Sequence, residues 1–259
     1  MVGSSGVPAQ SAARLMLRSF VFWSSLPVVA VQALRVRRNA LRMTPAEGPD
    51  SGSVGSGPPL RLLAIGDSII AGVGASTLAT ALVGRTAEAM AALSGRTVHW
   101  RAIGRSGINS TDMLDELVPR LPAESVDVFV VSIGVNDVTA LTRTARWKKN
   151  LDALLLALAS HSPGAVVAMA GIPPLREFPL LPHPLRSVIG YRGESLDRIL
   201  RDTIAAHSCS VHVPVEFEAQ ENRFSQDGFH PSEASYTEFG RAMAEHIVSR
   251  LPANSLTPR

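Results

Sequence analysis

The stretch that decides the fold is LLAIGDSIIAGVG, residues 62–74, in which an apolar run stops abruptly at Gly66, Asp67 and Ser68. A short apolar run of this kind predicts a buried strand, and the glycine and polar residues after it predict a turn. A helical pattern follows the turn. We therefore expect Ser68 to be exposed between the first strand and the first helix of the domain.

Short apolar runs alternate with helical patterns along the rest of the chain. The run VDVFVVSIG is too continuously apolar for a half-exposed strand, which indicates a central strand covered on both faces. This alternation predicts an α/β fold, a three-layer α/β/α sandwich with a central five-stranded, mostly parallel, flavodoxin-like sheet. The expected strands are residues 60–65, 97–102, 126–133, 165–170 and 210–215, and the expected helices are residues 76–93, 110–120, 144–160, 186–207 and 232–250.

The composition divides the chain into four parts. Residues 60–250 are expected to form the folded domain, and residues 251–259 a C-terminal tail. Residues 44–59, TPAEGPDSGSVGSGPP, are dominated by Pro, Gly and Ser and predict a flexible linker with too little apolar surface to fold. Residues 1–43 form an apolar and basic N-terminal segment.

The N-terminal segment has three interpretations. Residues 19–34, SFVFWSSLPVVAVQAL, are shorter than the roughly 20 apolar residues that span a bilayer and contain Pro27 and Gln32. A signal peptide, a helix that contacts a membrane surface through residues 14–42, and a helix packed on the domain all fit. The localisation therefore stays open between a membrane-associated or exported protein and a cytoplasmic one.

Charge and cysteine content exclude several kinds of partner. The formal net charge is +3 without a basic stripe, so no nucleic acid is expected to bind. The single cysteine, Cys209, excludes an intramolecular disulfide and a zinc site made of cysteines, and we expect it to be a small buried residue in a strand. The histidines show no metal-ligand spacing, so neither a metal nor an organic cofactor is expected.

Polar or glycine-rich segments follow the expected strands or precede the last helix. Because ligands collect at the carboxyl ends of parallel strands, we expect these segments to meet at one edge of the sheet. They are Gly66-Asp67-Ser68, GRSGINST at 104–111, Gly134-Val135-Asn136-Asp137 and DGFHPSEAS at 227–235.

The residue types in these segments complement one another. Asp227 and His230 are three residues apart, a spacing that lets the carboxylate orient the imidazole, which then activates Ser68 as a nucleophile. The backbone N–H groups of Ser68 and Gly107 and the side-chain amide of Asn136 supply donors for an oxyanion. Taken alone, each of these residues is explained at least as well as a turn or capping residue, and Ser68 and Asn136 are better explained in this way. An acyl-transfer site, however, needs all of these roles together.

In this order the four segments resemble the four blocks of the SGNH (GDSL-type) hydrolase superfamily, over essentially residues 60–250. The resemblance implies the SGNH hydrolase fold and a serine esterase or lipase. It implies Ser68 as the nucleophile, His230 as the base and Asp227 as its orienting carboxylate, with an oxyanion hole made by Ser68, Gly107 and Asn136. The supporting residues that it implies around these positions are Asp67, Gly134 and Asp137.

Two positions depart from the pattern of that superfamily. Ile69 replaces the commoner leucine after the serine, a swap that conserves volume. The second block lacks the asparagine often found before its glycine, which leaves Gly104 and Gly107 as candidates for the oxyanion donor. The continuation SGINST favours Gly107.

The loop GIPPLREFPLLPHPLRSVIGYRG, residues 171–193, bears on the substrate. Three apolar residues of this loop either form an apolar wall or a membrane-facing rim near the site, or pack the loop on the body: Phe178, Leu180 and Leu181. An apolar wall suits small-molecule or lipid esters with short to medium acyl chains, hydrolysed through an acyl-serine intermediate. The alternatives are an esterase for O-acetyl groups of carbohydrate or cell-envelope glycan, an acyltransferase, and a non-catalytic acyl-binding protein. The sequence leaves the oligomeric state open.

Overall fold

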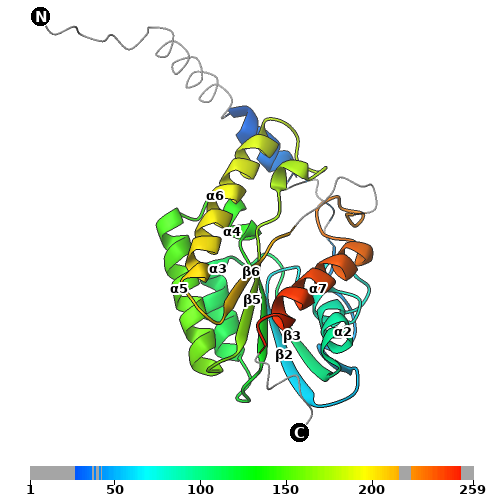
Figure 1. Ribbon diagram of the computed structural model, residues 1–259. Helices are drawn as coiled ribbons and strands as arrows, with labels where there is room; N and C mark the ends of the chain where they lie inside the picture. The colour runs from blue at the N-terminus through cyan, green and yellow to red at the C-terminus, as the bar shows by residue number, and fades with distance from the viewer. Residues whose placement is uncertain (1–26, 37, 39–40, 42, 216–222, 252–259) are drawn as a thin grey trace, which may run out of the picture.

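The computed structural model describes residues 27–36, 38, 41, 43–215 and 223–251 (Figure 1). Six strands form one sheet in the order β1-β3-β2-β4-β5-β6. Strands β2 to β6 are parallel to their neighbours, and β1 runs antiparallel to β3. The strands are β1 (Ser51–Val54), β2 (Pro59–Gly66), β3 (Thr97–Gly104), β4 (Val128–Ser132), β5 (Val166–Ala170) and β6 (Ser210–Val213).

Helices cover both faces of this sheet, which confirms the predicted three-layer α/β/α sandwich (Figure 1). Helices α2 and α7 pack on one face and α5 and α6 on the other. The helices are α2 (Leu82–Ser94), α3 (Ser110–Asp112) continued by the π-helix η1 (Met113–Leu117) and the 3₁₀ helix η2 (Val118–Arg120), α4 (Val135–Thr139), α5 (Thr144–His161), the 3₁₀ helix η3 (Leu175–Glu177), α6 (Leu185–Ala205) and α7 (Glu233–Val248).

Alternate side chains of the central strands divide the core into two layers. In β2, Leu63 and Ile65 belong to the layer under α5 and α6, whereas Leu62 and Ala64 face α2 and α7. This two-fold alternation is the geometry of any strand, since successive side chains point to opposite faces. Both faces are buried, so both sets are apolar, and the strand appears in the sequence as one continuous apolar run.

The sheet has six strands rather than the predicted five, because part of the predicted linker folds. Residues 51–54 pair with β3, in a register that places Ser51 beside Arg101 and Val54 beside Val98. Main-chain hydrogen bonds hold such an edge strand without large apolar side chains. Gly52 is needed there, because a Cβ at this position would lie 2.6 Å from the Trp100 ring.

Two further predictions about local structure are wrong. Helix α2 begins at Leu82 rather than at 76, since residues 67–80 form successive turns that include the positive-φ residues Gly72 and Gly74. Cys209 is exposed in a turn before β6, not buried in a strand.

The described N-terminal residues 27–36 are helical. In the part of the chain that the structure describes, no helix combines the length and the apolar character needed to cross a membrane.

Candidate active site

A cavity of about 600 Å³, called the main cavity below, lies at the carboxyl ends of the central parallel strands. It has a polar side, to which Ser68, Gly107, Asn136 and His230 all contribute. The sheet topology explains this meeting, because parallel strands deliver the segments that follow them to the same edge. Its apolar lining includes Leu41, Met43, Ile69, Val73, Ile133, Val135, Phe178, Val215, Phe229 and Phe239.

Ser68, His230 and Asp227 form a continuous line of hydrogen-bond contacts. The Ser68 Oγ lies 3.0 Å from Nε2 of His230, and Nδ1 of the same imidazole lies 2.6 Å from Oδ2 of Asp227. With the proton assigned to Nδ1, the imidazole donates to the carboxylate and leaves Nε2 as the acceptor for the serine hydroxyl. The nucleophile and its base are therefore in contact before any substrate binds.

The second oxygen of Asp227 is fully occupied by local donors. Oδ1 accepts hydrogen bonds from the backbone N–H groups of Phe229 and His230, both at 2.9 Å, and from the Ser225 hydroxyl at 2.8 Å. Burial raises the pKa of Asp227, but the hydrogen bonds from His230, Phe229 and Ser225 outweigh it, and the net pKa is lowered. The carboxylate thus stays ionised beside the imidazole, as an orienting group must.

Asp67 stabilises the turn at residues 67–70 that carries Ser68. Its Oδ1 accepts a hydrogen bond from the Ile69 N–H at 3.1 Å and from the Ser132 hydroxyl at 3.0 Å. These contacts tie the turn that carries Ser68 to the end of β4. The side chain is buried, and this burial raises the pKa of Asp67 to about 6 although both hydrogen bonds act in the opposite direction.

We expect the free energy of unfolding of the wild type to fall, relative to that of Asp67→Asn, as the pH rises from 4 to 7. A carboxyl with a raised folded-state pKa contributes stability that is fully present below its ordinary pKa of 3.8 and is lost as the pH rises through about 6. The difference between a pKa of 3.8 and one of about 6 corresponds to roughly 3 kcal/mol. Urea unfolding of both proteins across this pH range measures the difference, and a pH-independent difference contradicts the expectation.

The two glycines proposed for the second block occupy different environments. Gly107 lines the main cavity with a φ of +83°, and a Cβ there would meet nothing within 4 Å. Gly104 ends β3, and a Cβ there would lie 2.3 Å from the Ala71 nitrogen. Gly104 therefore allows close packing, while Gly107 presents its backbone to the cavity.

Asn136 lies at the start of α4, just after the positive-φ residue Gly134. Its Nδ2 donates to the Ile108 carbonyl at 2.8 Å, which orients the amide next to the loop that carries Gly107. An amide nitrogen has two protons, so one N–H holds this position and the other remains for a ligand in the cavity.

A buried polar network joins the two segments that carry Gly107 and Asn136. Asp137 accepts hydrogen bonds from the Ser110 N–H at 2.9 Å and the Ser110 hydroxyl at 2.7 Å. Asn150 of α5 donates to the same hydroxyl at 2.8 Å. Burial raises the pKa of Asp137, opposed by its hydrogen bonds with Ser110. The network fixes the spacing between the two oxyanion candidates.

The sequence did not reveal several of these supporting residues. These residues act through contacts with segments that are distant in the sequence, and no local spacing predicts such partners. They are Ser110, Ser132 and Asn150. Asn150 leaves one sequence signal, because it occupies a buried position on the same face of α5 as Leu154 and Leu158.

The first turn of α7 holds the loop that carries His230 against the turns that follow Ser68. Glu233 Oε1 accepts from the Ser76 N–H at 2.8 Å, the Ser76 hydroxyl at 2.7 Å and the Thr80 hydroxyl at 3.0 Å. Gly74 approaches Pro231 so closely that a Cβ would lie 2.2 Å from the proline carbonyl oxygen. Segments from the two ends of the domain are therefore locked together at the site.

The proline-rich loop contributes both to the cavity and to the core. Phe178 lines the main cavity, and its ring packs edge-on against Phe229 at 5.2 Å between centroids. Phe229 in turn contacts the His230 ring at 5.3 Å. Of the other two residues predicted for an apolar wall, Leu181 is buried in the core under α5 and α6, and Leu180 is not part of the cavity lining.

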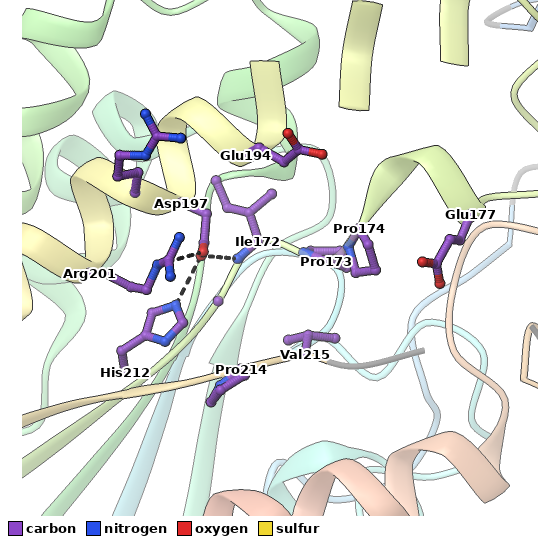
Figure 2. Close-up of a pocket in the computed structure, with 12 residues that line it drawn as sticks. Ile172, Pro173, Pro174, Glu177, Glu194, Asp197, Arg201, His212, Pro214 and Val215 are labelled. Atoms are coloured by element: carbon purple, nitrogen blue, oxygen red, sulfur yellow. Dashed lines mark hydrogen bonds and ion pairs between the residues drawn. The ribbon is translucent and has the colours of Figure 1, made fainter. Parts of the chain in front are cut away.

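A second cavity of about 560 Å³, the side cavity, shares Gly171, Pro173 and Val215 with the main cavity. Figure 2 shows Asp197 and Arg201 facing His212 there. Asp197 accepts from the Ile172 N–H at 2.9 Å and contacts His212 Nε2 at 2.9 Å and Arg201 Nε at 3.2 Å.

This carboxylate is an anchor rather than a reactive group. Burial raises the pKa of Asp197, but hydrogen bonds from His212 and Ile172 and the Arg201 charge leave it lowered. The described lining of the side cavity holds no serine, threonine or cysteine. Within the described residues, no group of three or more His, Cys, Asp or Glu is arranged to hold a metal ion.

Comparison with known proteins gives a family match for the chain. A model of the GDSL-like lipase/acylhydrolase family matches residues 64–237, which include all five residues proposed for the triad and the oxyanion hole. No curated protein matches the chain.

Solved structures share the fold at low identity. A lipase/acylhydrolase from Enterococcus faecalis is 22% identical with a TM-score of 0.59, and the match covers 74% of this chain and 97% of that one. A lipase from a goat rumen metagenome is 19% identical over the same shares, also with a TM-score of 0.59. An acetyl xylan esterase from Geobacillus stearothermophilus is 21% identical with a TM-score of 0.55, covering 77% and 98%.

Proposed function

Because the chain belongs to the GDSL-like lipase/acylhydrolase family and is therefore a carboxylic ester hydrolase, we propose that it cleaves short- to medium-chain acyl esters through an acyl-serine intermediate on Ser68. The observation that carries the proposal is the line of contacts at the main cavity, 3.0 Å from Ser68 to His230 and 2.6 Å from His230 to Asp227. The base lies between the nucleophile and the orienting carboxylate, which is the spatial arrangement that covalent acyl transfer requires.

In the first half-reaction, Ser68 Oγ attacks the ester carbonyl carbon while His230 Nε2 takes the hydroxyl proton. Asp227 stabilises the imidazolium that forms. The carbonyl oxygen becomes an oxyanion that accepts hydrogen bonds from the backbone N–H groups of Ser68 and Gly107 and from the Asn136 amide. Collapse of this intermediate breaks the ester bond, and His230 returns the proton to the departing alcohol oxygen.

In the second half-reaction, water replaces the alcohol. The water oxygen attacks the acyl-serine carbonyl carbon while His230 takes a proton from the water. The same hydrogen-bond donors stabilise the second oxyanion. Collapse releases the carboxylic acid and returns the proton to Ser68. The residues of this chain supply every proton transfer in the cycle.

The apolar side of the main cavity supports an acyl chain of limited length. Phe229 contacts the His230 ring, and Phe178 and Ile133 add apolar surface to the same cavity. Burial of an acyl chain's methylene groups against such surface favours binding. A volume of about 600 Å³ lies in the range of pockets for small ligands. A long fatty acyl chain would extend beyond it.

A second candidate is deacetylation of a carbohydrate or cell-envelope glycan. The side cavity supports it, since the polar groups of Asp197, His212 and Arg201 lie beyond the shared residues Gly171 and Pro173 and suit a polyhydroxy alcohol. The chain also shares its fold with an acetyl xylan esterase. Transfer of the acyl group to an alcohol instead of water remains a third outcome of the same intermediate.

A series of p-nitrophenyl esters from acetate to palmitate tests the proposal. We expect kcat/KM to be highest among the short to medium esters and to fall toward palmitate. A p-nitrophenyl alkylphosphonate should label the protein once, on the peptide that contains Ser68, as mass spectrometry would show. An optimum at palmitate contradicts the proposed chain length. Cleavage of acetyl esters alone, with release of acetate from acetylated glycan, favours the second candidate, and increased turnover with an added alcohol favours acyl transfer.

A further inference from the structure

Exposed apolar side chains gather on the N-terminal helix of the described chain. Eight large apolar side chains are strongly exposed among the described residues, and four of them lie within residues 28–41. Val28, Val31 and Leu34 are 49%, 48% and 55% exposed and are spaced three residues apart, which places them on one face of the helix. Leu41, also 55% exposed, follows shortly after. Large apolar residues concentrated in this way mark a surface that binds something.

The opposite face fixes this helix to the domain. Gln32 Nε2 donates to the His183 carbonyl at 2.6 Å, and its Oε1 accepts from the Leu185 N–H at 3.1 Å. Val29 and Val36 lie on the same side as Gln32 and pack against the core under α5 and α6. Among the described residues, the contacts between this helix and the domain are made by the face of Gln32, whereas Val28, Val31 and Leu34 stay about half exposed.

The helix is followed directly by residues that line the main cavity. Figure 1 shows residues 27–36, in blue, at the end of the molecule where the parallel strands have their carboxyl ends, next to the start of α6. Leu41 and Met43, which follow the helix, line the main cavity. Met43 Sδ lies 3.2 Å from the hydroxyl of Ser225, which also donates to Asp227. One short segment thus connects the exposed face to the triad.

The charge of the segment identifies the partner. Residues 1–46 contain six arginines, at positions 14, 18, 35, 37, 38 and 42, and no aspartate or glutamate. Arg35 and Arg38, which the structure describes, are exposed on the same short segment as the apolar face. A helix with an exposed apolar face and nearby arginines is complementary to an anionic lipid surface, since the apolar side chains enter the headgroup region while the cations meet lipid phosphates.

We infer that the face formed by Val28, Val31 and Leu34 docks on an anionic lipid bilayer and holds the Leu41 rim of the main cavity against it. The enzyme then takes its ester substrate from the membrane rather than from solution. The choice of substrate rests on the proposed ester hydrolysis, whereas the docking itself does not.

Sedimentation with lipid vesicles tests the docking in the full chain. The vesicles are made of phosphatidylcholine alone or of phosphatidylcholine with phosphatidylglycerol. The test variant is Val28→Ser/Val31→Ser/Leu34→Ser. The matched control is Leu93→Ser/Leu141→Ser/Leu156→Ser, which removes three similarly exposed apolar side chains from other surfaces. We expect the wild type and the control to bind the anionic vesicles in a salt-sensitive manner, and the test variant to bind about tenfold or more weakly.

Activity separates docking from catalysis. We expect the test variant to hydrolyse p-nitrophenyl butyrate in buffer like the wild type, and to hydrolyse a medium-chain ester presented in anionic vesicles more slowly, in proportion to its weaker binding. Absence of wild-type binding, or equal binding by the test variant, overturns the inference. So does a wild-type dimer that becomes a monomer in the test variant, because a second copy then covers the face. Vesicle binding without any ester cleavage refutes the proposed function and leaves the docking standing.

Discussion

The Ser68→Ala variant is expected to lose ester hydrolysis almost completely, with kcat lower by about 10⁴- to 10⁶-fold. The Oγ atom is the group that forms the covalent bond, and it is the serine oxygen in contact with His230 Nε2, at 3.0 Å. Without it, His230 has no serine proton to take, and the site has no oxygen that can form the acyl-serine. Steady-state kinetics on p-nitrophenyl butyrate measure the loss.

The same variant should remain folded, because the serine side chain is a minor part of its turn. The turn is held by backbone bonds such as that from the Val73 N–H to the Ser68 carbonyl at 3.0 Å, which alanine keeps. Loss of one hydrogen bond costs about 1 kcal/mol, which shifts the melting temperature of a chain of this size by roughly 2–4 °C.

Ser106→Ala is the matched control, since Ser106 is an exposed serine that lines the same cavity. We expect it to retain most of the wild-type turnover. If Ser68→Ala keeps substantial activity, or if both variants lose it equally, Ser68 is not the nucleophile. A large drop in melting temperature in Ser68→Ala alone would assign the residue to the turn.

Replacement of Asn136 by alanine should lower kcat by about 10²–10³-fold and change KM little. The free N–H of its amide is directed by the bond of Nδ2 to the Ile108 carbonyl, and it meets a full negative charge only when the tetrahedral intermediate forms. An interaction made mainly in the transition state affects turnover and not substrate binding. Kinetics on the best ester of the chain-length series separate the two constants.

Two further substitutions serve as controls for Asn136→Ala. Thr139→Ala removes a polar side chain from the same short helix α4, outside the main cavity, and should leave kcat close to that of the wild type. Asn136→Asp should be at least as inactive as Asn136→Ala, because a carboxylate repels the oxyanion. Unchanged turnover in Asn136→Ala, or a rise in KM alone, removes this residue from the oxyanion hole.

Much of the architecture follows from the sequence, because buried parallel strands leave strong local patterns. The run at 128–131 is apolar on both faces and predicts a strand at the centre of the sheet. Strand β1 could not be predicted, since Ser51, Gly52 and Ser53 are held by main-chain pairing to β3, which leaves no trace in hydrophobicity. The predicted start of α2, at residue 76 instead of Leu82, is wrong for a related reason. Residues 76–81 pack as turns on α7 through Glu233, a contact made across 157 residues of sequence.

The residues of the candidate site likewise fall into those that local motifs predict and those that only the folded structure reveals. Ser68, Gly107, Asn136, Asp227 and His230 follow from short motifs, because each needs a particular residue type next to a strand end. Their supports depend on tertiary contacts. Ser132 reaches Asp67 across 65 residues, and Asn150 reaches Ser110 across 40, so neither is visible until the chain is folded. The choice between Gly104 and Gly107 likewise depends on backbone conformation and surroundings.

The edge strand β1 also determines where the domain can be cut. β1 occupies the outer edge of β3, and Gly52 covers the ring of Trp100. A chain trimmed to residue 60, where the apolar pattern begins, would uncover that ring. It would also leave the N–H and C=O groups that β3 directs toward β1, within residues 98–102, open to pairing with other molecules. Such edges promote aggregation. The segment whose composition predicts a flexible linker therefore shields this edge of the sheet.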